Sequence, residues 1–350
     1  MKRYSIKMFL LVGLVLLSTS CKKEINDPRD LFRQTQKLQG EKLELPKYTL
    51  GLPLHLVYFR GYLLVVDRYN ESWLNIIDPQ TKSQVCQCIP IGKGPNEMIE
   101  LFGLKINGKK TFQTYDMRLR RIYEYHLDSI LKHKKAIPFK AYRPEFNHIY
   151  LQITPVGENY LASGMLPKGK YHLLDSAFAK INEISEYPEV KEHTDRNHLN
   201  MAFQGHILYQ ESLQKAVWCC SKYPMFEILT FEDQNLRIQK FYHELPSYKE
   251  NYNKNGGFAL LRNSNAKYGY PDLKTTDNFI YLLYSGRTMD EYPDSFNESE
   301  HVLVFDWEGN PVKHYQLDNP VVSFAVSNDD KTLYSLIREP YPEIYTYKLK

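Results

Sequence analysis

The stretch from Tyr62 to Ile77 contains two short apolar runs, YLLVVD at 62–67 and WLNII at 73–77, separated by the polar gap RYNES. Short runs rich in β-branched and aromatic side chains, bounded by turn residues, predict β-strands. The gap is short enough for the two strands to pair directly. This pair of strands is the unit from which the fold can be deduced.

The same pair recurs along the chain. First members lie at 62–67, 111–116, 160–164, 216–220, 279–284 and 333–337, and second members at 73–77, 121–127, 171–174, 225–231, 301–307 and 343–349. Repeats of roughly 50 to 60 residues built from short strands are typical of β-propellers. We therefore predict an all-β, six-bladed β-propeller of four-stranded antiparallel blades, with a pair of β-sandwich domains as the alternative.

The two ends of the chain predict how the ring closes. In the first blade four strands can be placed, at 55–59, 62–67, 73–77 and 84–89, whereas the last blade has candidates only at 321–326, 333–337 and 343–349. Residues 41–45 (EKLEL) alternate correctly for the missing outermost strand. Such closure would cover an exposed edge. The propeller is then predicted to span residues 40–350.

The N-terminus predicts export. Lys2, Arg3 and Lys7 precede an apolar run at 8–17, which is shorter than the roughly 20 residues of a membrane-spanning helix. Residues 1–20 therefore read as a signal peptide. Cys21 follows the small residues Ser18 to Ser20, a pattern that resembles the bacterial lipobox, with an ordinary signal peptide as the alternative.

The lipobox resemblance implies lipidation of Cys21. Residues 21–39 are then expected to form a flexible, lipid-anchored tether at the cell envelope, in the outer membrane on its periplasmic side or at the cell surface. The membrane would be a partner through this anchor, and the propeller itself is expected to be a monomer.

The repeated unit "turn, apolar run, Asp, gap, apolar run, Asp-x-x-Gly" resembles that of NHL and TolB-like six-bladed propellers. Residues 91–97 (IGKGPNE) resemble the Gly-x-Gly-Pro-x-Glu element of six-bladed propeller lipoproteins of Bacteroidota, with Asn96 where glycine is usual. The same segment lacks the last glycine of a dinucleotide fingerprint and the Gly-Lys-Ser/Thr ending of a P-loop, so we predict a turn between two blades. The resemblance implies the fold and leaves function open, because such propellers include lyases, hydrolases and binding proteins.

Composition argues against a nucleic-acid partner. The chain has 45 Lys plus Arg and 41 Asp plus Glu, and three of the cations lie in residues 1–20. The remainder carries a net charge near +1, without a long block of one sign.

Cysteine and histidine spacings match no standard metal site. Cys86, Cys88, Cys219 and Cys220 lack the C-x-x-C pairs of a zinc site and are predicted to be buried free thiols. His193, His198 and His206 are spaced by five and eight residues and are predicted to be surface histidines. No metal or other cofactor is expected.

Loop lengths predict which face of the ring carries function. The long connections at 90–100, 138–147, 188–198, 244–268 and 286–300 all belong to the two kinds that emerge on one face of a propeller. A cation also follows the second strand of every blade: Arg68, Arg118, Lys168, Lys222, Arg287 and Arg338. These six are candidate ligand-binding residues that could ring the central mouth and attract an anionic glycan or carboxylate peptide, and ordinary solvated loop cations are the alternative.

The sequence thus predicts an exported, lipid-anchored propeller that binds a glycan, a peptide or an envelope protein on its loop-rich face. The alternative is a lyase or hydrolase with its active site in the central funnel. No Gly-x-Ser-x-Gly elbow or other catalytic set is recognisable, so no catalytic residue is named and binding is favoured.

Overall fold

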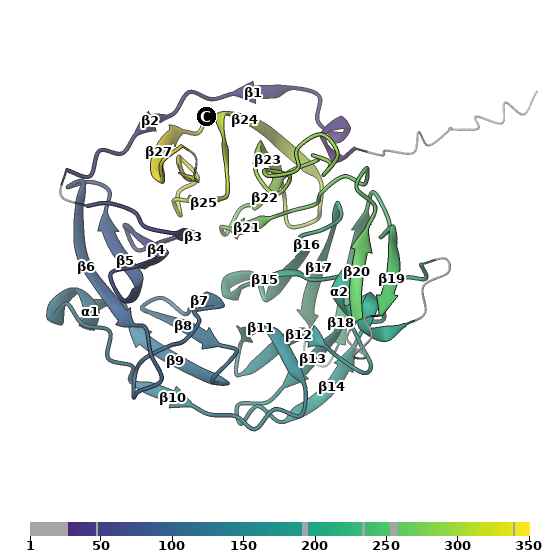
Figure 1. Cartoon of the computed structure of the whole chain (residues 1–350), viewed down its shortest axis with the longest axis horizontal. Helices are drawn as coiled ribbons and strands as arrows, with labels where there is room; N and C mark the ends of the chain where they lie inside the picture. Colours follow the sequence, from purple (N-terminus) through teal and green to yellow (C-terminus); the bar gives the residue numbers. More distant parts are fainter. Residues whose placement is uncertain (1–26, 47, 191–194, 233–234, 253–257, 339) are drawn as a thin grey trace, which may run out of the picture.

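The computed structural model describes residues 27–46, 48–190, 195–232, 235–252, 258–338 and 340–350. The chain forms a ring of six antiparallel sheets, the blades, around a central axis (Figure 1). This confirms the predicted six-bladed propeller. Each blade presents its first strand to the axis and its last strand to the rim.

The first three blades follow the chain in simple order. Blade one contains β3 (Pro53–Phe59), β4 (Tyr62–Tyr69), β5 (Ser72–Asp78) and β6 (Ser83–Pro90). Blade two contains β7 (Gly103–Asn107), β8 (Thr111–Asp116), β9 (Arg121–His126) and β10 (Lys140–Tyr142). Blade three contains β11 (Ile149–Val156), β12 (Asn159–Met165), β13 (Tyr171–Leu174) and β14 (Lys180–Ile184).

The last three blades contain the closure of the ring. Blade four contains β15 (Gly205–Gln210), β16 (Lys215–Cys220), β17 (Met225–Glu232) and β18 (Asn235–Tyr242). Blade five contains β21 (Asp272–Thr275), β22 (Ile280–Tyr284), β23 (Ser299–Phe305) and β24 (Pro311–Val321). Blade six contains β25 (Ser323–Val326), β26 (Thr332–Ile337) and β27 (Glu343–Lys348). The predicted run pairs are therefore the second and third strands of every blade, to within two residues at each end.

The hydrophobic core is divided among the interfaces between blades. Six buried apolar clusters occur in the described residues, one for each pair of neighbouring blades. Between blades six and one, for example, Ala325 and Leu336 pack with Leu56, Leu63 and Val65. Burying a side chain of this size stabilises the fold by about 1.5–3 kcal/mol. Both faces of each sheet are covered in this way, which explains why the central strands read as continuous apolar runs.

An N-terminal strand closes the ring, as predicted. Strand β2 (Glu41–Lys42) pairs antiparallel with β27, placing Lys42 opposite Tyr345. The pairing is shorter than the predicted 41–45, although the amide of Leu43 still donates to the carbonyl of Ile344 at 2.8 Å. Lys42 also forms an ion pair with Glu343 at 2.6 Å. The outer edge of the last blade is thereby covered.

The segment before β2 corrects the predicted tether at 21–39. A 3-10 turn, η1 (Pro28–Leu31), leads into β1 (Thr35–Lys37), which pairs parallel with β24 as a fifth strand of blade five. Phe32 packs on Phe305 with ring centroids 5.3 Å apart, and Asp27 pairs with Lys267 at 2.8 Å. Residues 27–39 are thus docked on the rim because apolar and ionic side chains fix them there. Residues 21–26 lie outside the described residues.

Few elements interrupt the blades. They are α1 (Leu127–His133), α2 (Arg196–Ala202), the 3-10 turn η2 (Glu211–Leu213) and a hairpin of β19 (Tyr248–Tyr252) with β20 (Phe258–Arg262). The hairpin lies in the predicted long connection at 244–268. Among the residues that the structure describes, no helix has the length and apolar character needed to cross a membrane.

One face of the ring carries most of the long connections. The strands of a blade alternate in direction, so the connections at 91–102, 185–204, 243–271 and 285–298 all leave the face at which the innermost strands begin. The opposite face has tight connections such as 60–61 and 157–158, with α1 as its main elaboration. This arrangement agrees with the predicted asymmetry, except that the predicted long connection at 138–147 contains β10, the outermost strand of blade two. We call the first side the loop-rich face.

The aspartate of the repeated unit holds loops in place. Asp67, at the end of the apolar run in β4, accepts hydrogen bonds from the amide of Gly51 at 3.0 Å and the hydroxyl of Tyr48 at 2.9 Å. Asp116 accepts from the amides of Ile99 at 2.6 Å and Leu119 at 2.9 Å. Both carboxylates are buried and accept their hydrogen bonds from groups of the same chain. The motif is therefore a structural signature of the blade.

Two further predictions are confirmed. Residues 91–97 join β6 to β7, with the Glu97 carboxylate folded back onto the amide of Gly94 at 2.7 Å. A side chain at Gly92 or Gly94 would collide with that carboxylate. Cys86, Cys88, Cys219 and Cys220 are all buried free thiols.

Candidate functional site

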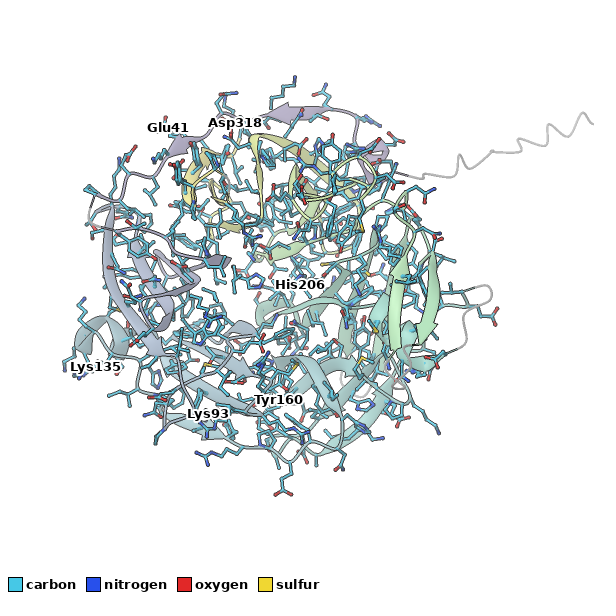
Figure 2. All side chains as sticks on the ribbon, in the orientation of Figure 1. Glu41, Lys93, Lys135, Tyr160, His206 and Asp318 are labelled. Atoms are coloured by element: carbon cyan, nitrogen blue, oxygen red, sulfur yellow. The ribbon has the colours of Figure 1, made fainter. Side chains whose placement is uncertain are left out.

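The innermost strand of every blade brings a polar side chain to the centre of the ring. We call the axial cluster the set His55, Lys105, Thr154, His206, Asp272, Lys274 and Ser323, which lie on β3, β7, β11, β15, β21, β21 and β25. Figure 2 shows His206 near the middle of the ring. Four members are buried, namely Lys105, Thr154, Asp272 and Ser323, whereas His55, His206 and Lys274 keep part of their surface exposed.

Contacts between blades, including blades that are not neighbours, pass through this centre. The rings of His55 in blade one and His206 in blade four are 6.2 Å apart between centroids. Lys105 Nζ of blade two donates to the carbonyl of Ile207 in blade four at 2.9 Å. Thr154 Oγ1 of blade three donates to the same carbonyl at 3.2 Å. The channel is therefore narrow at this level.

Asp272 has no acceptor capacity to spare. Its Oδ1 accepts from the amide of Leu273 at 2.8 Å and from Lys274 Nζ at 2.6 Å. Its Oδ2 accepts from Ser323 Oγ at 2.6 Å and from the amide of Phe324 at 3.1 Å. Ser323 Oγ in turn accepts from the amide of Leu56 at 3.0 Å, which links blades five, six and one.

Burial controls the charges of the axial cluster. Burial raises the pKa of Asp272, but the charge of Lys274 and its hydrogen bond to the carboxylate outweigh this and hold the pKa of Asp272 below its ordinary value. Desolvation lowers the pKa of His55 to about 4 and that of His206 to about 3, so both imidazoles are neutral at pH 7. It also lowers the pKa of Lys105 to about 8, which leaves this ammonium charged at pH 7.

The charges do not cancel. Lys274 and Asp272 neutralise each other as an ion pair at 2.6 Å. Lys105 has no carboxylate partner among the described residues, and its hydrogen bond goes to a neutral carbonyl. The axial cluster therefore carries one net positive charge at pH 7. Such a charge is costly to bury without a partner.

Hydrogen-bond donors are also left over. The Lys105 ammonium uses one of its three N–H groups within the described chain. Neither the His55 nor the His206 ring forms a hydrogen bond with any residue that the structure describes. The arrangement can therefore bind a hydrogen-bond acceptor in the channel. In the described residues no three His, Cys, Asp or Glu side chains are grouped to hold a metal ion.

The axial cluster is closest to the loop-rich face. The innermost strands begin at that face, and Asp272 and Ser323 are the first residues of β21 and β25. Arg338, which follows β26, lowers the pKa of His55 through its charge, so it lies near the mouth of the channel. Its buried Nε has no hydrogen-bond partner in the part of the chain that the structure describes.

The other five predicted ligand-binding cations have local surroundings on the loop-rich face. Arg118 pairs with Glu100 at 3.0 Å, and Arg287 pairs with Glu300 at 3.0 Å. The remaining three are Lys222, which donates to the Met201 carbonyl at 2.8 Å, Arg68, whose guanidinium lies 5.9 Å from the Trp73 ring centroid, and Lys168, which is exposed. Arg338 is the member of the predicted ring whose charge acts on the axial cluster.

The predicted surface histidines are placed differently. His198 is buried on α2, where its Nδ1 lies 2.9 Å from Asp195 Oδ1, and His206 belongs to the axial cluster. The surface prediction is therefore wrong for both, because α2 packs inward and β15 is an innermost strand. His193 lies outside the described residues.

A second polar cluster is buried between blades three and four. Lys170 Nζ lies 2.9 Å from Glu227 Oε1 and 3.1 Å from the centroid of the Trp218 ring. The hydroxyls of Tyr171, at 2.5 Å, and Tyr242 donate to the Glu227 carboxylate. Desolvation lowers the pKa of Lys170 to about 8, against the opposing charge of Glu227. Lys170 and Glu227 are 1% and 0% exposed, so this cluster is closed to ligands.

Comparisons with known proteins agree with the fold. A family model described as TolB-like 6-blade propeller-like matches residues 32–329. A DUF4221-family protein from Bacteroides vulgatus has 12% identity and a TM-score of 0.57, covering 91% of this chain and 97% of its own. A protein from Bacteroides fragilis, described as a candidate exported protein, has 13% identity and a TM-score of 0.52, covering 89% and 95%. No curated protein matches the chain.

Proposed function

We propose that this chain, which belongs to the TolB-like six-bladed propeller family, is an exported, lipid-anchored envelope protein that binds a ligand. The ligand, a glycan, peptide or envelope protein, would approach the loop-rich face and anchor one group in the axial cluster.

The observation that carries this proposal is the unused hydrogen-bonding capacity at the axis. A channel this narrow could be filled with apolar side chains, as the interfaces between blades are. Instead, Lys105 is buried without a carboxylate, and the His55 and His206 rings make no hydrogen bond in the described residues. Groups that cost stability in this way are expected where they serve binding.

The chemistry of the axial cluster favours binding over catalysis. A hydrolase or lyase needs a base beside an activated nucleophile or substrate proton. Asp272 spends all four of its hydrogen bonds within the fold, and the Ser323 hydroxyl donates to Asp272. Neither is presented to a substrate.

The test is a glycan array followed by an envelope-protein pull-down with residues 21–350. His206→Trp, which fills the axis, should abolish binding of whatever ligand is found. His126→Trp is the matched control, because His126 is exposed at the end of β9 on the opposite face. Binding that survives in both variants, with melting temperatures unchanged, would rule out the axial site.

Lipid anchoring is a separate part of the proposal. It rests on Cys21, which lies outside the described residues, and on the signal-like residues 1–20. Six peptide units from Cys21 to Asp27 span at most about 20 Å, so the blade-five rim would stay close to the membrane. Labelled fatty acid should enter the wild type and Ser18→Ala but not Cys21→Ala, which should be released as soluble monomer. Equal labelling of all three would contradict the anchor.

A further inference from the structure

We propose that the group bound in the axial cluster is a carboxylate, held by Lys105 together with the imidazoles of His55 and His206. This inference rests on the proposed binding function and names the chemistry of its ligand. The carboxylate would enter from the loop-rich face, past Arg338.

The charge of the axial cluster selects a monoanion. Asp272 and Lys274 already neutralise each other, so the single charge of Lys105 is the surplus. One carboxylate would balance it. A phosphate dianion would leave an uncompensated negative charge in a site with little water, and a cation would meet Lys105 directly.

The available hydrogen bonds also fit a carboxylate. The Lys105 ammonium has two N–H groups beyond the one given to Ile207, and each neutral imidazole has one N–H. Those four donors match the roughly four lone-pair sites of a carboxylate. Asp272 cannot compete for them, because Lys274, Ser323 and two backbone amides occupy it.

The narrowness of the channel requires the carboxylate to be terminal. The His55 and His206 rings meet edge to face across the axis, with 6.2 Å between their centroids. A chain could not thread between them, so the acid must stand at an end of the ligand. Two sources carry such a group, a peptide C-terminus and an acidic sugar.

The experiment follows the imidazole carbon-bound protons of His55 and His206 by NMR in the full mature chain. The probes are acetate, N-acetylglycine as a peptide terminus, and methyl glucuronide as an acidic sugar, with acetamide as the neutral control. Acetate should shift both histidines saturably, and acetamide should not. Whichever larger probe binds more tightly identifies the source.

Two variants locate the charge. Lys105→Met should weaken acetate binding at least tenfold. Lys109→Met is the matched control, since this lysine is exposed in the turn between β7 and β8, on the opposite face of the same blade, and it should change nothing. Should Lys105→Met fold poorly, the wild type itself provides the test, because binding should weaken as pH rises past about 8 and Lys105 loses its proton.

The pH test must be read against the other groups at the axis. Lys105 is surrounded by Lys274, Asp272 and Cys219, and His55 is also affected by the charge of Arg338. The imidazoles titrate far below pH 8, and Asp272 stays ionised, so they do not produce a loss of binding there. The pKa of the Cys219 thiol is raised well above its ordinary value by burial, which removes it from this range.

Three outcomes would overturn the carboxylate. They are no shift with any acid, equal binding of acetate and acetamide, and equal binding of acetate by the wild type and a folded Lys105→Met. A screened ligand that needs His206 but carries no acid would overturn this inference and leave the proposed binding function standing. If no ligand depends on His206 for binding, both the carboxylate inference and the proposed binding function are overturned.

Discussion

Lys105 and Lys170 are two buried lysines whose pKa values are both lowered to about 8 by burial, yet their surroundings differ. Lys170, between blades three and four, has a carboxylate at 2.9 Å and lies against the Trp218 ring. Lys105, at the axis, has a backbone carbonyl at 2.9 Å and no carboxylate partner in the described chain.

The difference teaches that a shifted pKa does not by itself mark a functional residue. The Lys170 cluster is neutral overall and almost fully buried, so its charges hold two blades together. The axial cluster keeps one positive charge and unused donors next to partly exposed imidazoles. Partners and accessibility, rather than the pKa, separate a structural lysine from one available to a ligand.

The largest effect is expected from breaking the Lys170 ion pair. Lys170→Met leaves Glu227 buried without its cation and should lower the free energy of unfolding by about 3–5 kcal/mol. Urea denaturation followed by tryptophan fluorescence would measure it. The double variant Lys170→Met/Glu227→Gln should recover most of the loss, because an amide oxygen can still accept from Tyr171. An equally large loss in the double variant would mean that packing, not charge, is responsible.

Asp272→Asn should have the next largest effect. It should lower the stability of the fold and strengthen acetate binding. It leaves Lys274 unpaired near Lys105 and weakens the link to Ser323, so the free energy of unfolding should fall by about 2–3 kcal/mol. It also raises the surplus charge at the axis, so acetate should bind more tightly. Weaker acetate binding by a folded variant would contradict the electrostatic account.

Lys105→Met should behave unlike Lys170→Met. Removing a buried cation that lacks a carboxylate should leave the free energy of unfolding unchanged or raise it by about 1 kcal/mol at pH 7. The Ile207 carbonyl keeps its hydrogen bond from Thr154 at 3.2 Å. Thermal denaturation of the two single variants side by side gives the comparison. A loss as large as that of Lys170→Met would make Lys105 a structural residue too.

The stability of the wild type and that of Lys105→Met should also depend differently on pH. Lys105 has a pKa of about 8 when folded and 10.5 as its ordinary value. Between these values the unfolded chain binds more protons, so the contribution of Lys105 to the free energy of unfolding rises with pH, by on the order of 3 kcal/mol. Below pH 8 it is constant. The free energy of unfolding of the wild type should therefore rise relative to that of Lys105→Met between pH 8 and 10.5. Parallel dependence on pH in the two proteins would contradict the lowered pKa of Lys105.

The smallest effects concern the predicted basic ring. Arg338→Gln should raise the pKa of His55, because the Arg338 charge lowers it, whereas Arg118→Gln should leave the His55 titration unchanged. Arg118→Gln should change the free energy of unfolding by less than about 0.5 kcal/mol, as exposed ion pairs do. NMR titration of His55 distinguishes the two. Equal changes in the pKa of His55 in the two variants would mean that both arginines act on His55 through their charges.

Much of the fold could be predicted from the sequence because its signals are local. The second and third strands of each blade are apolar runs of four to eight residues bounded by turns, and their covering on both faces makes them easy to recognise. Closure by residues near Glu41 followed from a missing strand at the other end. The parallel strand β1 and the β19–β20 hairpin escaped prediction, since three to five residues carry too weak a pattern.

The candidate site was predicted only in part. The loop-rich face and Arg338 could be deduced from loop lengths and from the repeated cation after each second strand. His206 was noticed, but its sequence neighbours suggested a surface position. At least one polar residue in the innermost strand of every blade was the signal that could have found the axial cluster.

The sequence by itself determined the repeat, the number of blades and the strand that closes the ring, because neighbouring residues and a fixed spacing encode them. Only the tertiary structure decided that His55, Lys105, His206 and Asp272 share one small volume. These residues come from blades one, two, four and five, and no local pattern links them. Their charge states were fixed by the same event, since burial at the axis lowers the pKa of both imidazoles and of Lys105, and the fold gives the Lys105 ammonium no carboxylate partner among the described residues.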